Sequence, residues 1–283
     1  MELPVSFIQN ADLESLDPNT ELRFVHILGD SQALIYDGLL GKYYDNDDKI
    51  IIFKFVTMHC PRTREPLVDS HYQKLVRDDI LNAVARIGTL RQQGLTGDVL
   101  VFSDGSFQMH DFLYARGIVN DIDFEEPGRV VPRDTSRPIV PYALIRQEVK
   151  QQLAKLELGS FLKVMVNSGF PIGFMVPPPP PHKSDTVINE PHESFRPEGR
   201  NMPIIPLLTR TKVHRLFINE IEAICSGEGV EPVNLWDETT EGHALKPQFE
   251  LDGAHPNRDF AMCVGARIIE RTVAIERGEK DVG

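Results

Sequence analysis

The stretch that decides the fold is residues 22–31, LRFVHILGDS, in which an apolar run of strand length ends in Gly29-Asp30-Ser31. A second motif, DGAH at residues 252–255, lies near the other end of the chain. A serine after a first strand, with an aspartate and a histidine three residues apart, provides the side-chain types of a nucleophilic triad. Neither motif is specific alone, because Gly, Asp and Ser are common in turns. Their order along the chain favours an enzyme that transfers an acyl group.

The two motifs divide the chemistry of such a triad between them. A serine hydroxyl is a weak nucleophile until a neighbouring base removes its proton, and this assigns the nucleophile to Ser31. Histidine suits the role of base because its pKa lies near neutrality, and a carboxylate on its other ring nitrogen orients it. We therefore predict His255 as the general base and Asp252 as its orienting partner. Gly253 between them permits the sharp turn that presents both side chains to one site.

Outward from residues 22–28, strand-like and helix-like runs alternate through most of the chain. Such alternation predicts a parallel sheet with helices on both faces, and ligands of such sheets bind at the carboxyl ends of the strands. Ser31 follows directly after a predicted strand and so falls at that edge. Further strands are predicted at 49–56, 99–102, 170–176 and 230–235, and helices at 71–93, 140–158, 207–226 and 258–276.

Two long segments interrupt the regular pattern, and we treat residues 1–283 as one domain with excursions at about 121–141 and 177–206. Loops of this length are usually lids, binding elements or disordered segments, and a plain surface excursion is the equal alternative. The proline run 177–181 favours a stiff, extended conformation. The first excursion is expected to be solvated at its polar positions Glu125, Glu126, Arg129, Arg133 and Arg137.

Composition excludes several classes of function. The net charge of −12 over 283 residues argues against nucleic acid as a partner, because such binding depends on clustered Lys and Arg. No apolar run reaches the roughly 20 residues that cross a bilayer, and no secretion signal is evident, so we expect no membrane partner. Three widely separated cysteines without CxxC spacing predict reduced thiols in the cytoplasm and no metal site. The sequence contains neither a phosphate-binding loop nor a dinucleotide-binding fingerprint, so we expect no cofactor.

On the motifs GDS at 29–31 and DGAH at 252–255, the chain resembles the SGNH, or GDSL-like, hydrolase superfamily. Residues 233–237, VNLWD, are also similar to the family's last strand and its approach to the histidine. The resemblance spans about residues 22–276. It implies a three-layer α/β/α sandwich with a central, mainly parallel five-stranded sheet of the flavodoxin-like kind. It also implies Ser31, His255 and Asp252 in the roles given above.

The chain departs from that family where the donors to the oxyanion are expected. The family has a glycine after the second strand, where this chain has residues 57–60, TMHC. It has Gly-x-Asn-Asp after the third strand, where Gly105 fits the glycine but Phe107 stands in place of the asparagine. The segment resembles a divergent branch often linked to glycan metabolism. We predict the amides of Ser31 and Gly105 as donors, with the side chains of Gln108 or His110 beside them.

Three hypotheses follow from these motifs. The first is a serine esterase, an acyl hydrolase that works through an acyl-enzyme on acylated carbohydrates or other small polar esters. The second is an O-acyltransferase of the same fold, in which a sugar hydroxyl takes the place of the attacking water. The third is a non-catalytic binding protein that keeps the fold and the end motifs, since a fold does not determine a function.

Overall fold

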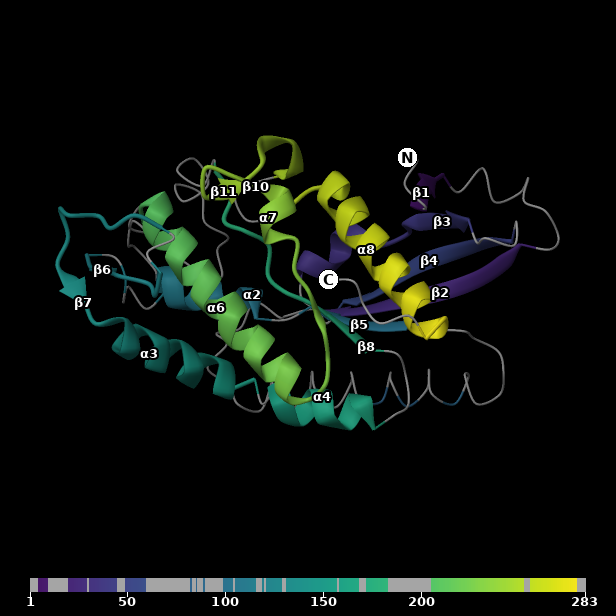
Figure 1. Cartoon of the computed structure of the whole chain (residues 1–283), viewed down its shortest axis with the longest axis horizontal. Helices are drawn as coiled ribbons and strands as arrows, with labels where there is room; N and C mark the ends of the chain where they lie inside the picture. The colour runs from purple at the N-terminus through teal and green to yellow at the C-terminus, as the bar shows by residue number, and fades with distance from the viewer. Residues whose placement is uncertain are drawn as a thin grey trace.

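The fold is a seven-stranded sheet with helices on both of its faces (Figure 1). The structure is a computed structural model, and it describes residues 5–9, 20–29, 31–44, 49–59, 82, 85, 89, 99–103, 105–115, 119, 121–128, 131–156, 158–167, 172–182, 205–251 and 255–278.

The sheet is parallel at its centre and antiparallel at one edge. Its strand order is β1 (Val5–Ile8), β3 (Leu40–Tyr44), β4 (Ile50–His59), β2 (Glu21–Gly29), β5 (Val99–Ser103), β8 (Ile172–Met175) and β9 (Pro232–Val233). The last five of these pair in parallel, and β1 and β3 pair antiparallel. Taken in chain order, the parallel strands follow the flavodoxin-like order 2-1-3-4-5. The mainly parallel sheet is confirmed, and the two antiparallel edge strands were not predicted.

Alternate residues of the strands supply two separate cores, one on each face of the sheet. Leu28 and Phe102 pair across β2 and β5 and face one cluster, whereas Ile27 and Val101 pair beside them and face the other. On the second face lie η2 (Ser31–Tyr36) and α8 (Arg258–Glu276). On the first face lie α2 (Ser106–His110), η3 (Asp111–Ala115), α3 (Tyr142–Ala154), α4 (Leu158–Val166) and α6 (Leu207–Gly227). This arrangement is the predicted three-layer sandwich.

The predicted helices differ in how well their bounds match the structure. The closing helix coincides with α8, whose first turn is capped by the Asn257 side chain accepting from the amides of Asp259 and Phe260 at 3.0 and 3.2 Å. The predicted helix 140–158 is too long, because α3 ends at Ala154 and a second helix, α4, begins at Leu158. Of the predicted helix 71–93, residues 82, 85 and 89 are described, and they are helical.

The first excursion is fastened to α6 by buried charges. It carries the short parallel pair β6 (Asp123–Phe124) and β7 (Ile139–Val140). The Lys212 ammonium donates to both Asp123 oxygens at 2.9 and 2.7 Å and to the Phe124 carbonyl at 3.0 Å, and both charged side chains are almost fully buried. Glu126 is also buried, 2.9 Å from Arg215 Nε. The expectation of a solvated surface is therefore wrong for Glu126, because α6 offers it a cation.

The prolines after β8 form an extended segment, residues 177–181, that we call the Pro strap. Four of its five residues lack regular structure, and Pro181 forms an isolated parallel bridge with Leu245. Prolines have no amide hydrogen, so the strap can only accept hydrogen bonds. Its carbonyls accept from His214 Nδ1 at Pro178 (3.0 Å), from the Leu245 amide at Pro180 (2.8 Å) and from Arg210 Nη1 at Pro181 (3.1 Å).

Short elements complete the chain between α6 and α8. They are α7 (Trp236–Thr239), the hairpin of β10 (Thr240–Glu241) and β11 (Ala244–Leu245), and η5 (Pro247–Phe249). Residues 183–204 of the second predicted excursion lie outside the described residues. In the described part of the chain, none of the helices combines the length and apolar character needed to cross a bilayer.

Candidate active site

The first predicted motif lies where the order of the parallel strands in the sheet reverses. β2 is flanked by β4 and β5, so the carboxyl ends of β2 and β5 form the switch point at which such sheets hold ligands. Gly29 ends β2 and pairs with Ser103 at the end of β5. A Cβ on Gly29 would lie 2.5 Å from the Ser103 carbonyl oxygen, so a larger residue has no room there. Ser31 begins η2, two residues after Gly29; its side chain lies outside the described residues.

Backbone hydrogen bonds join the residues that flank the second predicted motif. The Leu251 amide donates to the His255 carbonyl at 3.1 Å, and the Asn257 amide donates to the Phe249 carbonyl at 2.7 Å. The segments on the two sides of residues 252–254 are therefore adjacent, and His255 lies shortly before α8. Asp252 lies outside the described residues.

The two motifs are carried on elements that pack against each other. η2 and α8 share one hydrophobic cluster, in which Ala33 and Tyr36 belong to η2 and Phe260 belongs to the first turn of α8. At the end of η2, the Asp37 carbonyl accepts from Arg258 Nη1 at 3.3 Å. The structure thus brings together the segment that begins with Ser31 and the helix that follows His255. The contact between the triad side chains themselves stays a prediction.

The residues predicted beside the oxyanion occupy different environments. Gly105 follows β5 with φ of +97°, and a Cβ there would lie 2.8 Å from Ile221 Cδ1, so both conformation and space require glycine. Gln108 is buried in α2, and no described residue bonds its Oε1. The ring of His110 lies 6.5 Å from that of His214, centroid to centroid, which places it beside α6.

His214 was missed by sequence reasoning and is the most buried histidine of this region. Its Nδ1 lies 3.0 Å from the Pro178 carbonyl, which can only accept, so Nδ1 carries the proton of the neutral ring. Burial lowers the pKa of His214 well below that of an exposed histidine, and the neighbouring His110 lowers it further. A neutral imidazole therefore links α6 to the Pro strap.

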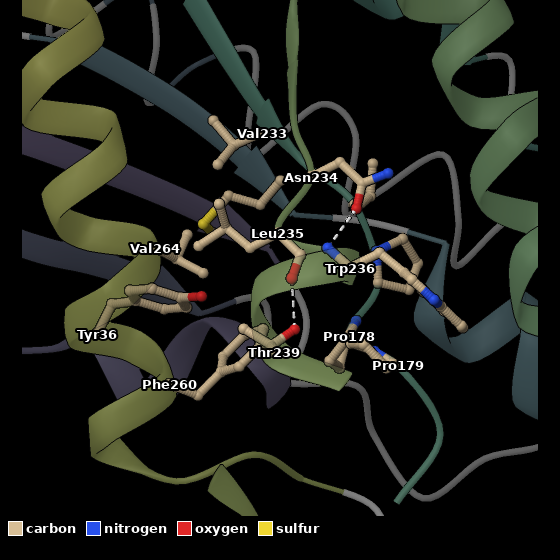
Figure 2. A pocket seen from close by; sticks show the side chains of 13 residues that line it. Tyr36, Pro178, Pro179, Val233, Asn234, Leu235, Trp236, Thr239, Phe260 and Val264 are labelled. Carbon is tan, nitrogen blue, oxygen red and sulfur yellow. Dashed lines mark hydrogen bonds between the residues drawn. The ribbon is translucent and has the colours of Figure 1, made fainter. Parts of the chain in front are cut away.

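A small pocket lies at the carboxyl ends of β8 and β9 (Figure 2). Its walls come from the end of η2 through Tyr36, from α8 through Phe260 and Val264, from the Pro strap and from α7 through Trp236. Sequence reasoning did not identify this pocket. The one available signal was the tryptophan in residues 233–237, the only one in the chain.

No metal centre is formed by the described residues, among which no three His, Cys, Asp or Glu side chains gather as a metal would require. Cys225 is a buried free thiol and Cys263 an exposed one, and Cys60 lies outside the described residues.

The fold and the two motif-bearing segments define an α/β/α protein whose predicted nucleophile lies at the switch point of the sheet. The chain is similar to solved structures of GDSL-like lipases and acylhydrolases. A GDSL-like lipase from Bacteroides thetaiotaomicron is 12% identical, with 90% of this chain and 89% of that chain covered and a TM-score of 0.45. A candidate acylhydrolase from Bacteroides fragilis is 10% identical, with 90% and 88% covered and a TM-score of 0.44. A lipase/acylhydrolase from Enterococcus faecalis is 12% identical, with 88% and 94% covered and a TM-score of 0.37. No protein-family model and no curated protein matches the sequence.

Proposed function

We propose that the protein is a serine hydrolase of the SGNH type that cleaves carboxylic esters, with Ser31, His255 and Asp252 as its triad. One observation supports this most strongly. The segment that starts with Ser31 and the helix that follows His255 pack together, through η2 and α8, on the same face of the sheet. The elements that follow two motifs more than 200 residues apart in the sequence therefore pack on each other, which supports a shared site.

In the proposed mechanism, His255 removes the proton of the Ser31 hydroxyl as its oxygen attacks the ester carbonyl. The alcohol then leaves with a proton from His255, and an acyl group stays on Ser31. Water, activated by the same imidazole, attacks this acyl-enzyme and releases the acid. Asp252 orients the ring and stabilises its charged form. The amides of Ser31 and Gly105, with Gln108 or His110, are the proposed oxyanion donors, each of which is worth about 10²–10³ in turnover in enzymes of this kind.

The proposed substrates are small molecules, either acylated carbohydrates or other small polar esters. The net charge of −12 disfavours polyanions. We further propose that the chain forms one domain, because strands from residue 5 to residue 233 join one sheet. The free thiols Cys225 and Cys263 are compatible with the proposed cytoplasmic location.

The test is turnover of acetyl esters by the wild type and by Ser31→Ala and His255→Ala. Each substitution should lower kcat by about 10³-fold or more, because triad members act as one unit. Ser160→Ala, an exposed serine on α4, is the matched control and should leave kcat unchanged. Wild-type turnover by Ser31→Ala would refute the proposal.

A second arm of this test adds a sugar acceptor and measures acetate and acetylated sugar separately. A hydrolase releases acetate at the same rate with and without the sugar. Acetyl groups found mainly on the sugar would instead identify an O-acyltransferase that uses the same acyl-enzyme.

A further inference from the structure

An uninterrupted apolar run, residues 138–144 (PIVPYAL), joins the first excursion to α3. Val140 and Tyr142 turn inward and pack against the core cluster on the first face of the sheet. The other residues of the run are exposed, Ile139 by 39% and Leu144 by 55%. Single exposed apolar side chains are normal on a protein surface, but a run of them is unusual without a function. We call the exposed residues the tip patch: Pro138, Ile139, Pro141, Ala143 and Leu144.

The tip patch includes a backbone edge that the rest of the described chain does not cover. The Pro138 carbonyl accepts from the Asp123 amide at 2.9 Å, so it points toward β6. Because successive residues of an extended strand point their backbone groups to opposite sides, the N–H and C=O of Ile139 point away from β6. Within the described residues, neither group is in a hydrogen bond. Such an edge is a template for pairing with another strand.

The neighbours of Ile139 limit what can pair with this edge. Pro141 has no N–H to offer, and the Arg137 amide already donates to the Asp134 carbonyl at 3.4 Å. In the described part of the edge, Ile139 therefore supplies a single donor beside a single acceptor. An identical edge related by a two-fold axis matches this arrangement, because two opposed residues of an antiparallel pair exchange both of their N–H···O bonds. A longer foreign strand would meet the prolines on either side.

The charges around the tip patch also favour an identical partner. They are of both signs: Arg133, Arg137, Arg146, Asp134 and Glu148. A two-fold copy can place the basic side chains of one surface opposite the acidic side chains of the other. An anionic lipid surface would instead require an excess of free basic side chains. Here Arg137 contacts Asp134 at 3.3 Å, and Arg146 contacts Glu220 of α6.

We infer that the tip patch is the interface of a homodimer, in which β7 pairs antiparallel with the same strand of a second copy and Ile139 lies at the two-fold axis. This interface goes beyond the proposed function and does not depend on it. β7 lies at one end of the long axis of the molecule, far from α8, so the dimer leaves the proposed active site open (Figure 1). The patch is small, so we expect a reversible dimer that dissociates on dilution.

The first experiment is sedimentation of the full chain at protein concentrations from micromolar to millimolar. The wild type should pass from monomer to dimer as its concentration rises. Ile139→Asp and Leu144→Asp place like charges across the interface, so each should weaken the dimer about tenfold or more. Ile275→Asp, at a 61% exposed position on α8, is the matched control and should dimerise as the wild type does. A wild type that stays monomeric throughout, or dimers that are as strong in both tip variants, would overturn the inference.

The second experiment tests the position of the two-fold axis by cross-linking. The Cα atoms of a hydrogen-bonded antiparallel pair lie about 5.5 Å apart, within the roughly 4.4–6.8 Å that a disulfide spans. Ile139→Cys should therefore form a dimer on mild oxidation, with the disulfide mapped by mass spectrometry to residue 139 of both chains. Thr135→Cys, an exposed position of the same excursion, is the control and should not cross-link. Disulfides through the native cysteines alone would contradict the proposed pairing.

A third measurement tests the other occupant of an exposed apolar patch, a membrane surface. Wild-type protein is mixed with vesicles that contain phosphatidylserine, and bound protein is separated by flotation. The protein should stay with the unbound fraction. Binding that Ile139→Asp abolishes, by a wild type that sediments as a monomer, would overturn the dimer and assign the tip patch to lipid. Circular dichroism checks that each variant in these experiments is folded.

Discussion

Gly29 shows at the scale of one residue why the motif needs glycine at that position. Its missing Cβ would meet the Ser103 carbonyl oxygen at 2.5 Å and the Ser103 Cβ at 2.9 Å, and backbone cannot move aside as a flexible side chain can. We expect Gly29→Ala to lower the free energy of unfolding by about 1–3 kcal/mol, as overpacking does in other proteins. Urea unfolding followed by circular dichroism measures this change.

Gly173 is the matched control for that substitution, since it too lies in a parallel strand of the same sheet. A Cβ there would be 3.6 Å from Val101 Cγ2, an ordinary contact. Gly173→Ala should therefore be neutral or stabilise by up to about 1 kcal/mol through the unfolded chain. Equal effects of the two substitutions would contradict the close approach at the switch point.

His214 predicts a dependence of stability on pH. The groups that face it are His110, Arg210 and the Pro178 carbonyl. Its pKa is lower in the folded protein than the roughly 6.5 of an unfolded chain, because it is buried. Above that pH the ring is neutral in both states and its contribution is constant. As the pH falls below it, the unfolded chain binds a proton that the folded protein does not, so stability falls.

The corresponding variant is His214→Gln, whose side-chain amide can still donate to the Pro178 carbonyl. Denaturant unfolding between about pH 7 and pH 5 should show a smaller loss of stability for this variant than for the wild type. If the two lose the same amount, the buried neutral histidine is not responsible for the acid sensitivity.

At the scale of elements, α6 holds the first excursion through a buried ion pair. Lys212→Met leaves the Asp123 carboxylate buried without its cation, which should cost about 3–5 kcal/mol of unfolding free energy. The double variant Lys212→Met, Asp123→Leu removes both charges and should recover much of that loss. Urea denaturation of the single and double variants makes the comparison. A double variant no more stable than the single one would mean that the pair contributes mainly through packing.

The sequence predicted elements well where one local signal was enough. The strand around Val101 is a continuous apolar run and the one around Ile27 is mostly apolar, and α8 begins at a clear cap, Asn257. The sequence predicted less well the elements and burial that depend on contacts between residues far apart in the chain. At the edge of the sheet, β3 pairs with β4 and β1 pairs with β3, contacts that no local pattern in the sequence indicates. Glu126 reads as a surface residue until Arg215 is placed beside it.

At the scale of the whole molecule, the sequence predicted which strand ends lie together better than it predicted the pocket. The order of the strands brings the ends of β2 and β5 together, and the packing of α8 on η2 brings His255 to the same region. Both arrangements follow from the regular connections between strands and helices, which a sequence pattern can predict. The pocket could not be predicted in this way, because Tyr36, Trp236 and Val264 come from three separate segments and no local pattern indicates that they meet.

The most direct test of the account is whether Ser31 is an activated nucleophile. A fluorophosphonate probe reacts with a serine only when a base has raised its nucleophilicity. The wild type should gain the mass of one phosphonyl group, and peptide mapping should place it on Ser31. Ser31→Ala and His255→Ala should gain none while remaining folded. A folded wild type that is not labelled, or labelling that persists in Ser31→Ala, would contradict the catalytic account.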